Sequence, residues 1–201
     1  MPVTINGDGS ITGLSVGGLP NGTVDADTLA SNAVTTVKIA NDAVATAKIA
    51  SGAVTGVKQG TGSVIQVVQG TKTSGSSYGS ATFGDLGLSA SITPQTNSKV
   101  LCLISIGSVG ITYSSNRGFG IKLLRGSTQV YVDPIDYAIQ GNWASADGRV
   151  RADWNILDSS PGGNGSTSLT YKIQVATHGG RSVSFCEGNT TSALTLLEIK
   201  G

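Results

Sequence analysis

Aromatic residues are absent from the first third of the chain. All ten aromatic residues of the 201-residue sequence lie between Tyr78 and Phe185. Because aromatic side chains contribute much of the apolar area that protein cores bury, we expect a packed core only in the C-terminal two thirds. The region before Tyr78 is then elongated, and its apolar residues must be covered by something other than a core of its own.

Charge is scarce as well. Charged residues make up 12% of the chain, and the formal net charge is +1. Residues 1–60 hold three Lys and four Asp, a net charge of −1, which leaves +2 for the remainder. This distribution indicates no basic patch for nucleic acid or anionic lipid. No apolar run approaches the roughly 18–20 residues of a membrane span, so the sequence predicts neither a nucleic-acid partner nor membrane insertion.

Thiol and imidazole groups are limited to Cys102, Cys186 and His178. Each Cys lies in an apolar, strand-like run, and two thiols do not make a disulfide framework. We therefore expect buried free thiols, with a single bridge as the alternative. The three residues lack the clustered spacing of a metal site, so no metal and no cofactor is predicted.

Catalysis finds little support in the sequence. His178 is followed by two Gly residues, a pattern typical of a turn, and no other His could act as the base of a Ser/His/Asp device. Glycan cleavage needs two carboxylates that face one sugar bond. The closest pairs in sequence are ordinary for loop edges: Asp133 with Asp136, and Asp147 with Asp153. We predict no catalytic residue and expect that the chain is not an enzyme.

A ten-residue repeat occupies residues 21–60. Aligning its four decads places Val at the fourth position of each, Leu or Ile at the ninth position of the first three, and Asn, Asp, Ser or Gly at the junctions. The two apolar columns consist of Val24, Leu29, Val34, Ile39, Val44, Ile49 and Val54. A fixed short period indicates an array of small units that cannot bury their own apolar faces.

The spacing of the columns indicates the kind of array. An apolar residue at every fifth position fits neither the 3.6-residue period of a helix nor the two-residue period of a strand. It suits identical chains wound side by side with the columns facing a common axis, and we predict a shaft of three copies. Within it, Asp27–Ala30, Thr36–Ala40 and Thr46–Ala50 can each form one helical turn. The alternative is a flexible linker, although a linker gains nothing from regularly placed Val and Ile.

Residues 1–20 form a candidate docking segment. Gly-containing turns separate the apolar residues, which suits short β segments that pair with another surface rather than with each other. The candidate docking residues are Val3, Ile5, Ile11, Leu14, Val16 and Leu19. The Gly residues also permit close backbone approach to a partner. A frayed terminus is the alternative interpretation.

Residues 61–201 have the pattern of an all-β domain. Eight or nine short strand-like runs follow one another, separated by turn residues, with no long helix. Alternation supports this interpretation, because every second residue in 169–175 and in 150–156 is apolar and would face a core. The sequence therefore predicts a mainly β fold, in which an extended N-terminal segment and a repeat shaft precede a β-sandwich or jelly-roll head.

The longest part of the head without strand alternation lies between Asp133 and Gly148. It combines aromatic faces with amides and carboxylates, which suit sugar rings because C–H faces stack while hydroxyls form hydrogen bonds. The candidate receptor-binding residues are Asp136, Tyr137, Asn142, Trp143 and Asp147. In the alternative, which we favour, Tyr137 and Trp143 fill the inter-subunit core of a trimer.

Several segments resemble one group of proteins. They are Val3–Leu14, Gly17–Pro20, the decads, Ile92–Pro94, Leu157–Gly162, Tyr171–Gln174 and Leu194–Ile199. Together they resemble tail-fibre and related virion structural proteins of bacteriophages, particularly marine and cyanobacterial phages, over nearly the whole chain. The resemblance implies a homotrimeric fibre with its N-terminus on the virion and a β-rich head similar to the C1q/TNF-like jelly-roll trimers. The chain departs from the pattern at Lys58-Gln59-Gly60, and it is short for a long tail fibre.

The sequence thus leads to one functional hypothesis and two alternatives. The hypothesis is a non-enzymatic, homotrimeric tail fibre, assembled in the host cytoplasm and exposed on the virion surface. Residues 1–20 would bind a tail, baseplate or capsid protein, residues 21–60 would form the shaft, and residues 61–201 would contact a host surface glycan or protein. The alternatives are a capsid decoration or head-fibre protein bound to the shell through its N-terminus, and a glycan-cleaving tail spike.

Overall fold

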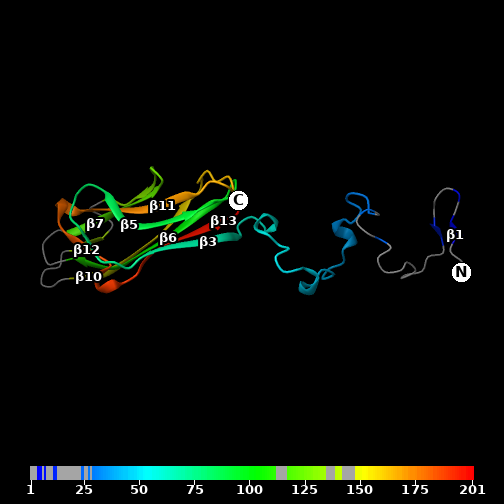
Figure 1. Ribbon diagram of the computed structural model, residues 1–201, viewed down its shortest axis with the longest axis horizontal. Helices are drawn as coiled ribbons and strands as arrows, with labels where there is room; N and C mark the ends of the chain where they lie inside the picture. Colours follow the sequence, from blue (N-terminus) through cyan, green and yellow to red (C-terminus); the bar gives the residue numbers. More distant parts are fainter. Residues whose placement is uncertain are drawn as a thin grey trace. The chain divides into compact units, whose positions relative to one another are not determined.

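The computed structural model describes residues 30–111, 117–134, 139–141 and 148–201, with isolated positions at 4–5, 7, 11–12, 24, 27 and 29. The chain divides into two compact units, Met1–Ala53 and Val54–Gly201. Each unit is described by itself below, and Figure 1 traces the chain through both.

The decads of the first unit share one backbone pattern. A hydrogen bond of 2.9 Å from the N–H of Ala33 to the carbonyl of Ala30 closes a β-turn, and one turn of 3-10 helix, η1 (Thr36–Lys38), follows. The same pattern recurs ten residues later and ends in η2 (Thr46–Lys48). The prediction of one helical turn is confirmed for Thr36–Ala40 and Thr46–Ala50, with 3-10 geometry, and Asp27–Ala30 is described only in part.

Turn geometry explains the residue types at the decad junctions. The third residue of each β-turn has a positive φ angle, which is 64° at Asn32, 63° at Asp42 and 78° at Gly52. Gly enters this left-handed region without steric cost, and Asn and Asp tolerate it better than other residues do. The backbone conformation of each turn therefore explains why Asn, Asp or Gly occupies this junction position.

Two short strands lie near the N-terminus. Strand β1 (Thr4–Ile5) pairs antiparallel with β2 (Ile11–Thr12), so that Ile5 lies opposite Ile11. The expectation that the segments of residues 1–20 do not pair with each other is wrong for these residues. Gly7 adopts a turn conformation between the strands, and Gly permits the tight reversal that brings the two strands together.

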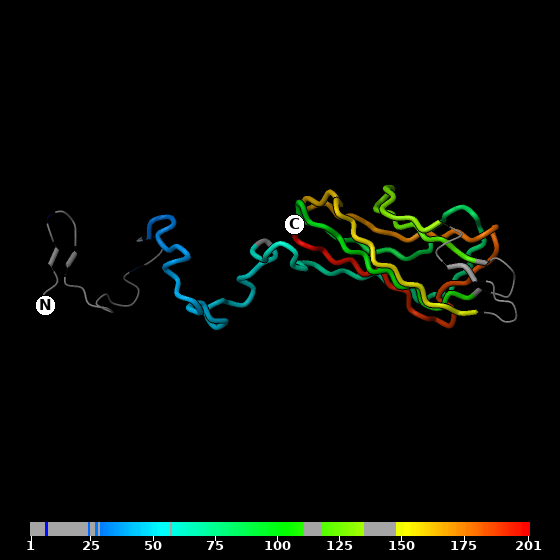
Figure 2. The backbone as a smooth tube through the Cα atoms, turned by 180° about the vertical axis from the view of Figure 1, so that it is seen from behind, coloured from blue at the N-terminus to red at the C-terminus, as the bar shows by residue number. Residues whose placement is uncertain are grey.

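The second unit contains two antiparallel sheets (Figures 1 and 2). In the first sheet, β6 pairs with β10 on one side and with β13 and β12 on the other, and β3 and β4 form the opposite edge. Its strands are β3 (Val64–Lys72), β4 (Ser76–Tyr78), β6 (Lys99–Ile111), β10 (Gly148–Asp158), β12 (Val183–Phe185) and β13 (Ser192–Ile199).

The second sheet has the order β5-β11-β7-β8, with β9 also pairing with β7. Its strands are β5 (Gly84–Ile92), β7 (Arg117–Arg125), β8 (Thr128–Val132), β9 (Ile139–Gly141) and β11 (Leu169–Thr177). Short 3-10 turns, η3 (Gly56–Lys58), η4 (His178–Gly180) and η5 (Glu187–Asn189), complete the unit. Successive strands alternate between the sheets from β4 to β7 and again from β9 to β12. The result is a jelly-roll-like arrangement, as the sequence predicts.

The core lies between the two sheets. The predicted alternation in β11 and β10 is confirmed, because Tyr171, Ile173 and Val175 are buried while the intervening side chains are more exposed. At the centre, the rings of Phe119 and Phe185 meet edge to face with centroids 5.3 Å apart, the geometry that aromatic quadrupoles favour. In the described part of the chain, no helix has the length and apolar character needed to cross a membrane.

Candidate functional site

The apolar columns of the decads are the candidate assembly surface. All seven side chains that the sequence assigns to them are largely exposed in the single chain, from 42% at Ile49 to 56% at Val34. Covering the exposed part of one such side chain is worth about 1 kcal/mol, so repeated coverage would stabilise an assembly substantially. The inward-facing role of these residues remains a prediction.

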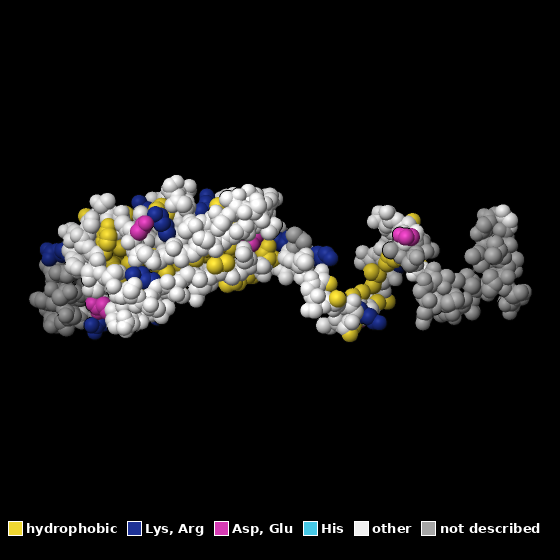
Figure 3. All heavy atoms as spheres, in the orientation of Figure 1, with side chains coloured by type: hydrophobic (Ala, Val, Ile, Leu, Met, Phe, Trp, Pro, Cys, Tyr) yellow, Lys and Arg dark blue, Asp and Glu magenta, His cyan; other side chains and the backbone are white. Residues whose placement is uncertain are grey.

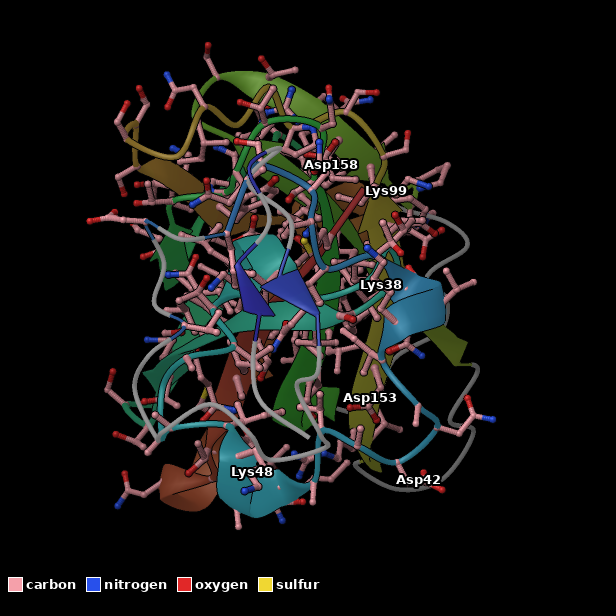
Figure 4. The ribbon with its side chains drawn as sticks, turned by 90° about the vertical axis from the view of Figure 1, so that its right-hand side faces the viewer. Lys38, Asp42, Lys48, Lys99, Asp153 and Asp158 are labelled. Carbon is pink, nitrogen blue, oxygen red and sulfur yellow. The ribbon has the colours of Figure 1, made fainter. Side chains whose placement is uncertain are left out.

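Lysine side chains belong to the same repeat. Lys38 and Lys48 project from η1 and η2 (Figure 4). The Nζ of Lys38 donates a hydrogen bond of 2.8 Å to the carbonyl of Ala33 at the preceding turn. A Lys near the end of a helical turn also interacts favourably with the partial negative charge there. Lys occupies the eighth position of the second, third and fourth decads, and the sequence alone predicts no role for it. The hydrogen bond to Ala33 indicates that Lys38 stabilises the local turn.

The predicted docking residues are described only in part. Ile5 and Ile11 lie opposite one another in the β1–β2 ladder, of which the structure describes the backbone. Val3, Leu14, Val16 and Leu19 lie outside the described residues. The docking role of this segment therefore remains a prediction.

The five candidate receptor-binding residues, Asp136, Tyr137, Asn142, Trp143 and Asp147, also lie outside the described residues. At the start of their segment, the Nε1–H of Trp154 donates a hydrogen bond of 2.7 Å to the carboxylate of Asp133. Burial, followed by the hydrogen bond with Asp133, raises the pKa of Tyr131. Asp133 thus acts as an acceptor that anchors neighbouring aromatic side chains.

A buried polar cluster links strands of the two sheets. The hydroxyl of Tyr171 in β11 donates a hydrogen bond of 2.8 Å to Asp158 at the end of β10, and Arg125 of β7 forms an ion pair with the same carboxylate. Burial raises the pKa of Tyr171, and the hydrogen bond with Asp158 raises it further. The sequence contains no signal for this cluster, because its members lie on three separate strands. Its satisfied contacts indicate a structural role.

Thiol and imidazole groups show no catalytic arrangement. Both Cys102 and Cys186 are buried free thiols, which confirms the sequence prediction. Burial raises the pKa of Cys102 to about 12, which keeps it in the poorly nucleophilic protonated form. His178 begins the turn η4, as its Gly neighbours predict. Within the described ranges, no group of three or more His, Cys, Asp or Glu side chains could hold a metal ion.

A cavity of about 390 Å³ lies where the last decad meets the head, within the second unit. Its lining consists of Thr55, Gly56, Ile65, Gln66, Thr93, Gln95, Gly165 and Glu198. The one carboxylate in this lining belongs to Glu198, which is buried and accepts a hydrogen bond of 2.6 Å from the N–H of Gln95. This carboxylate has a structural hydrogen bond. Glycoside cleavage would require a second carboxylate that faces it, and the described residues of the lining include none.

No family model and no curated protein matches the chain. Among solved structures, it is similar to the VP2 subviral particle of infectious bursal disease virus, with 13% identity and a TM-score of 0.41, covering 68% of this chain and 33% of that one. The Gx strain of the same virus gives 16% identity and a TM-score of 0.39, with coverage of 68% and 32%. Dimeric latent PorU from Porphyromonas gingivalis gives 10% identity and a TM-score of 0.32, with coverage of 70% and 14%.

The chain therefore spans about a third of the length of the viral proteins that it matches. Sequence identities of 10–16% and TM-scores of 0.32–0.41 support no inference about the function of this chain.

Proposed function

We propose that this chain is a non-enzymatic structural protein of a bacteriophage virion that assembles as a homotrimeric fibre. The observation that carries the proposal is the regular placement of aliphatic residues at the fourth and ninth decad positions, where seven such side chains are 42–56% exposed in the single chain. Regular apolar exposure of this kind indicates an interaction surface. Sister copies of the same chain carry the same period and can cover it along its whole length.

The assignment to a phage particle is supported by the resemblance of the opening segment, the decads and the later strand motifs to tail-fibre proteins. In this proposal, residues 1–20 bind another virion protein at the tail, the baseplate or the capsid. The head contributes to host-surface attachment, with Asp136, Tyr137, Asn142, Trp143 and Asp147 as candidate contacts. In the interpretation that the sequence favours, Tyr137 and Trp143 instead fill the inter-subunit core of the trimer.

Sedimentation of the purified full-length chain tests the assembly. We expect one species with three times the chain mass of 20.2 kDa, independent of dilution over a wide range. A monomer at micromolar concentration would refute the fibre proposal, because the decads would then remain uncovered in solution.

Location on the particle is tested by gold-labelled antibody against residues 61–201 in electron micrographs of virions. Label at the tail supports the tail-fibre assignment, and label over the shell supports capsid decoration instead. Incubating the protein with purified host envelope glycan tests the non-enzymatic assignment, which released oligosaccharide would overturn.

A further inference from the structure

The outer face of the first sheet carries a continuous row of aliphatic side chains. Strand register places Leu157 of β10 opposite Leu101 of β6, Leu101 opposite Leu197 of β13, and Leu197 opposite Val67 of β3. Alternation along each strand puts all four on the face that points away from the core. The row therefore crosses the sheet from one edge to the other.

Neighbouring positions extend this row into a patch. Val67 is 60% exposed, Leu157 49% and Val64 47%, and the other members are half-buried. We call this patch the outer apolar face; it consists of Val64, Val67, Leu101, Leu103, Leu157, Leu197 and Ile199. Figure 3 shows hydrophobic side chains gathered over the β3 edge of this sheet.

The strands that carry the outer apolar face have an unusual pattern for a solvated sheet. An antiparallel sheet with one face in water normally alternates apolar and polar residues, whereas strands covered on both faces read as continuous apolar runs. Residues 100–104 of β6 are Val-Leu-Cys-Leu-Ile, and residues 64–68 of β3 are Val-Ile-Gln-Val-Val. Both runs indicate that the outer face is also covered.

Polar side chains share this face with the apolar ones: Asn155 and Thr195 lie on either side of Leu103, and several polar side chains pair with one another. Gln69 donates a hydrogen bond of 2.8 Å to Thr195, and Arg151 donates one of 2.9 Å to Ser105. Arg149 is paired with Glu187 at 2.6 Å. The charged residue that borders the outer apolar face is Lys99, which is exposed and lies opposite Ile199 at the start of β6. Over the row from Leu157 to Val67, identical copies can meet without like charges facing one another.

The repeat leads directly into the outer apolar face. The four decads end at residue 60, and Val64 lies ten residues after Val54, at the spacing of the fourth-position column. The turn before Val64 has φ of 87° at Gly62 and a bond of 3.2 Å from Ser63 N–H to the Gly60 carbonyl, matching the corresponding turn one decad earlier. The fourth-position column therefore continues, with its backbone pattern intact, to the first residue of β3.

We infer that the outer apolar face packs against the same face of sister chains around the fibre axis. This inference rests on the proposed homotrimer and adds which side of the head faces the axis. The second sheet, β5-β11-β7-β8, then faces outward. The occupant is a second copy because the column that the sisters cover in the decads ends in this face.

The area of the outer apolar face determines whether the heads can associate without the decads. Four strands about 4.8 Å apart, each covered over a span of about three residues at about 3.3 Å per residue, give an area on the order of 200 Å². Stable interfaces bury about 800 Å² per partner. The face is therefore too small to hold free heads together, and it closes only when the decads keep the copies at high local concentration.

Spin labelling of the full-length chain tests the orientation of the head. Thr71→Cys places a nitroxide on the outer face of β3, and Thr170→Cys places one on the outer face of the other sheet; both positions are exposed. The wild-type chain measures background labelling, since its two cysteines are buried. Packed sheets lie about 10 Å apart, so pulsed electron spin resonance should give inter-chain distances at least about 10 Å shorter for Thr71 than for Thr170.

A second variant keeps the test specific. Val67→Lys in the Thr71→Cys chain should lengthen and broaden the distances, whereas Gln129→Lys on exposed β8 should leave them unchanged. A trimeric mass with distances at Thr170 equal to or shorter than those at Thr71 overturns the orientation and leaves the fibre intact. A monomeric mass in the same samples overturns the fibre and, with it, the inference.

Discussion

At the scale of single residues, burial of Cys102 changes the ionisation of its thiol group. Its side chain points from β6 into the core and is fully buried. Burial raises its pKa from the ordinary value of 9.0 to about 12, with the negative charge of Asp158 adding to the rise and Arg125 opposing it. The protonated thiol then behaves as a small apolar group, and its titration becomes linked to unfolding.

We predict that alkaline conditions destabilise the protein through this thiol. Because the pKa of Cys102 is higher in the folded state, its contribution is complete below about pH 9 and is lost as the pH rises toward about 12. Between these values the free energy of unfolding should fall by about 1.4 kcal/mol per pH unit from this group alone. Urea unfolding from about pH 8 to about pH 11, with a reductant present, measures the slope.

The control is Cys102→Ala, which removes the titration. This variant should be less stable at every pH because it leaves a cavity, yet its stability should decline less steeply between about pH 9 and about pH 10. Above about pH 10, Tyr171, whose pKa is also raised by burial, adds a loss common to both proteins. Equal slopes in the two proteins below that point would contradict the assignment to Cys102.

Gly70 tests a second single-residue requirement. A Cβ atom at this position of β3 would overlap the backbone carbonyl of Ser89 in β5, where the edges of the two sheets meet. We predict that Gly70→Ala lowers the free energy of unfolding by about 1–3 kcal/mol, since backbone must move to admit the methyl group. Gly75→Ala is the matched control, because its Cβ would lie at an ordinary 3.5 Å from the nearest atom. Similar thermal midpoints for the two variants would contradict the prediction.

At the scale of elements, each decad combines a backbone requirement with a surface requirement. The junction residues Asn32, Asp42 and Gly52 satisfy the positive φ of the turn, while the Val and Ile columns are free of any such constraint. In the proposed fibre, their regularity follows from the sister chains that they contact. This separation allows the two requirements to be tested independently by substitution within the same ten residues.

Replacing Val34, Ile39 and Val44 with Asp should dissociate the assembly, because unpaired like charges would be buried near one axis. The matched control places Asp at Thr36, Ala43 and Ala47, which are exposed positions outside the two columns. Sedimentation should give a monomer for the first variant and an unchanged mass for the control. A full assembly mass in the column variant would refute the inward-facing assignment.

At the scale of the whole molecule, the fold class could be predicted and the outer apolar face could not. Alternation at Tyr171 and Ile173 is a local pattern that identifies a strand and its buried side. In contrast, the row from Val67 to Leu157 depends on the register of four strands far apart in sequence, and a slip of one residue would turn a strand over. The continuous apolar runs in β3 and β6 were a signal that a second face is covered, although they did not indicate which residues align.

The second unit contains the described core, whereas most of the proposed assembly residues lie in the first unit, and this separation leads to a final prediction. Every buried hydrophobic residue in the described core lies between Leu86 and Leu196, inside the second compact unit. A chain that begins at Val54 should therefore fold by itself and melt in one cooperative transition. Because the outer apolar face is smaller than a stable interface requires, this shortened chain should sediment as a monomer while the full-length chain sediments as a trimer. Calorimetry and sedimentation on the same two samples measure both properties, and a trimeric shortened chain would show that the heads, rather than the decads, hold the copies together.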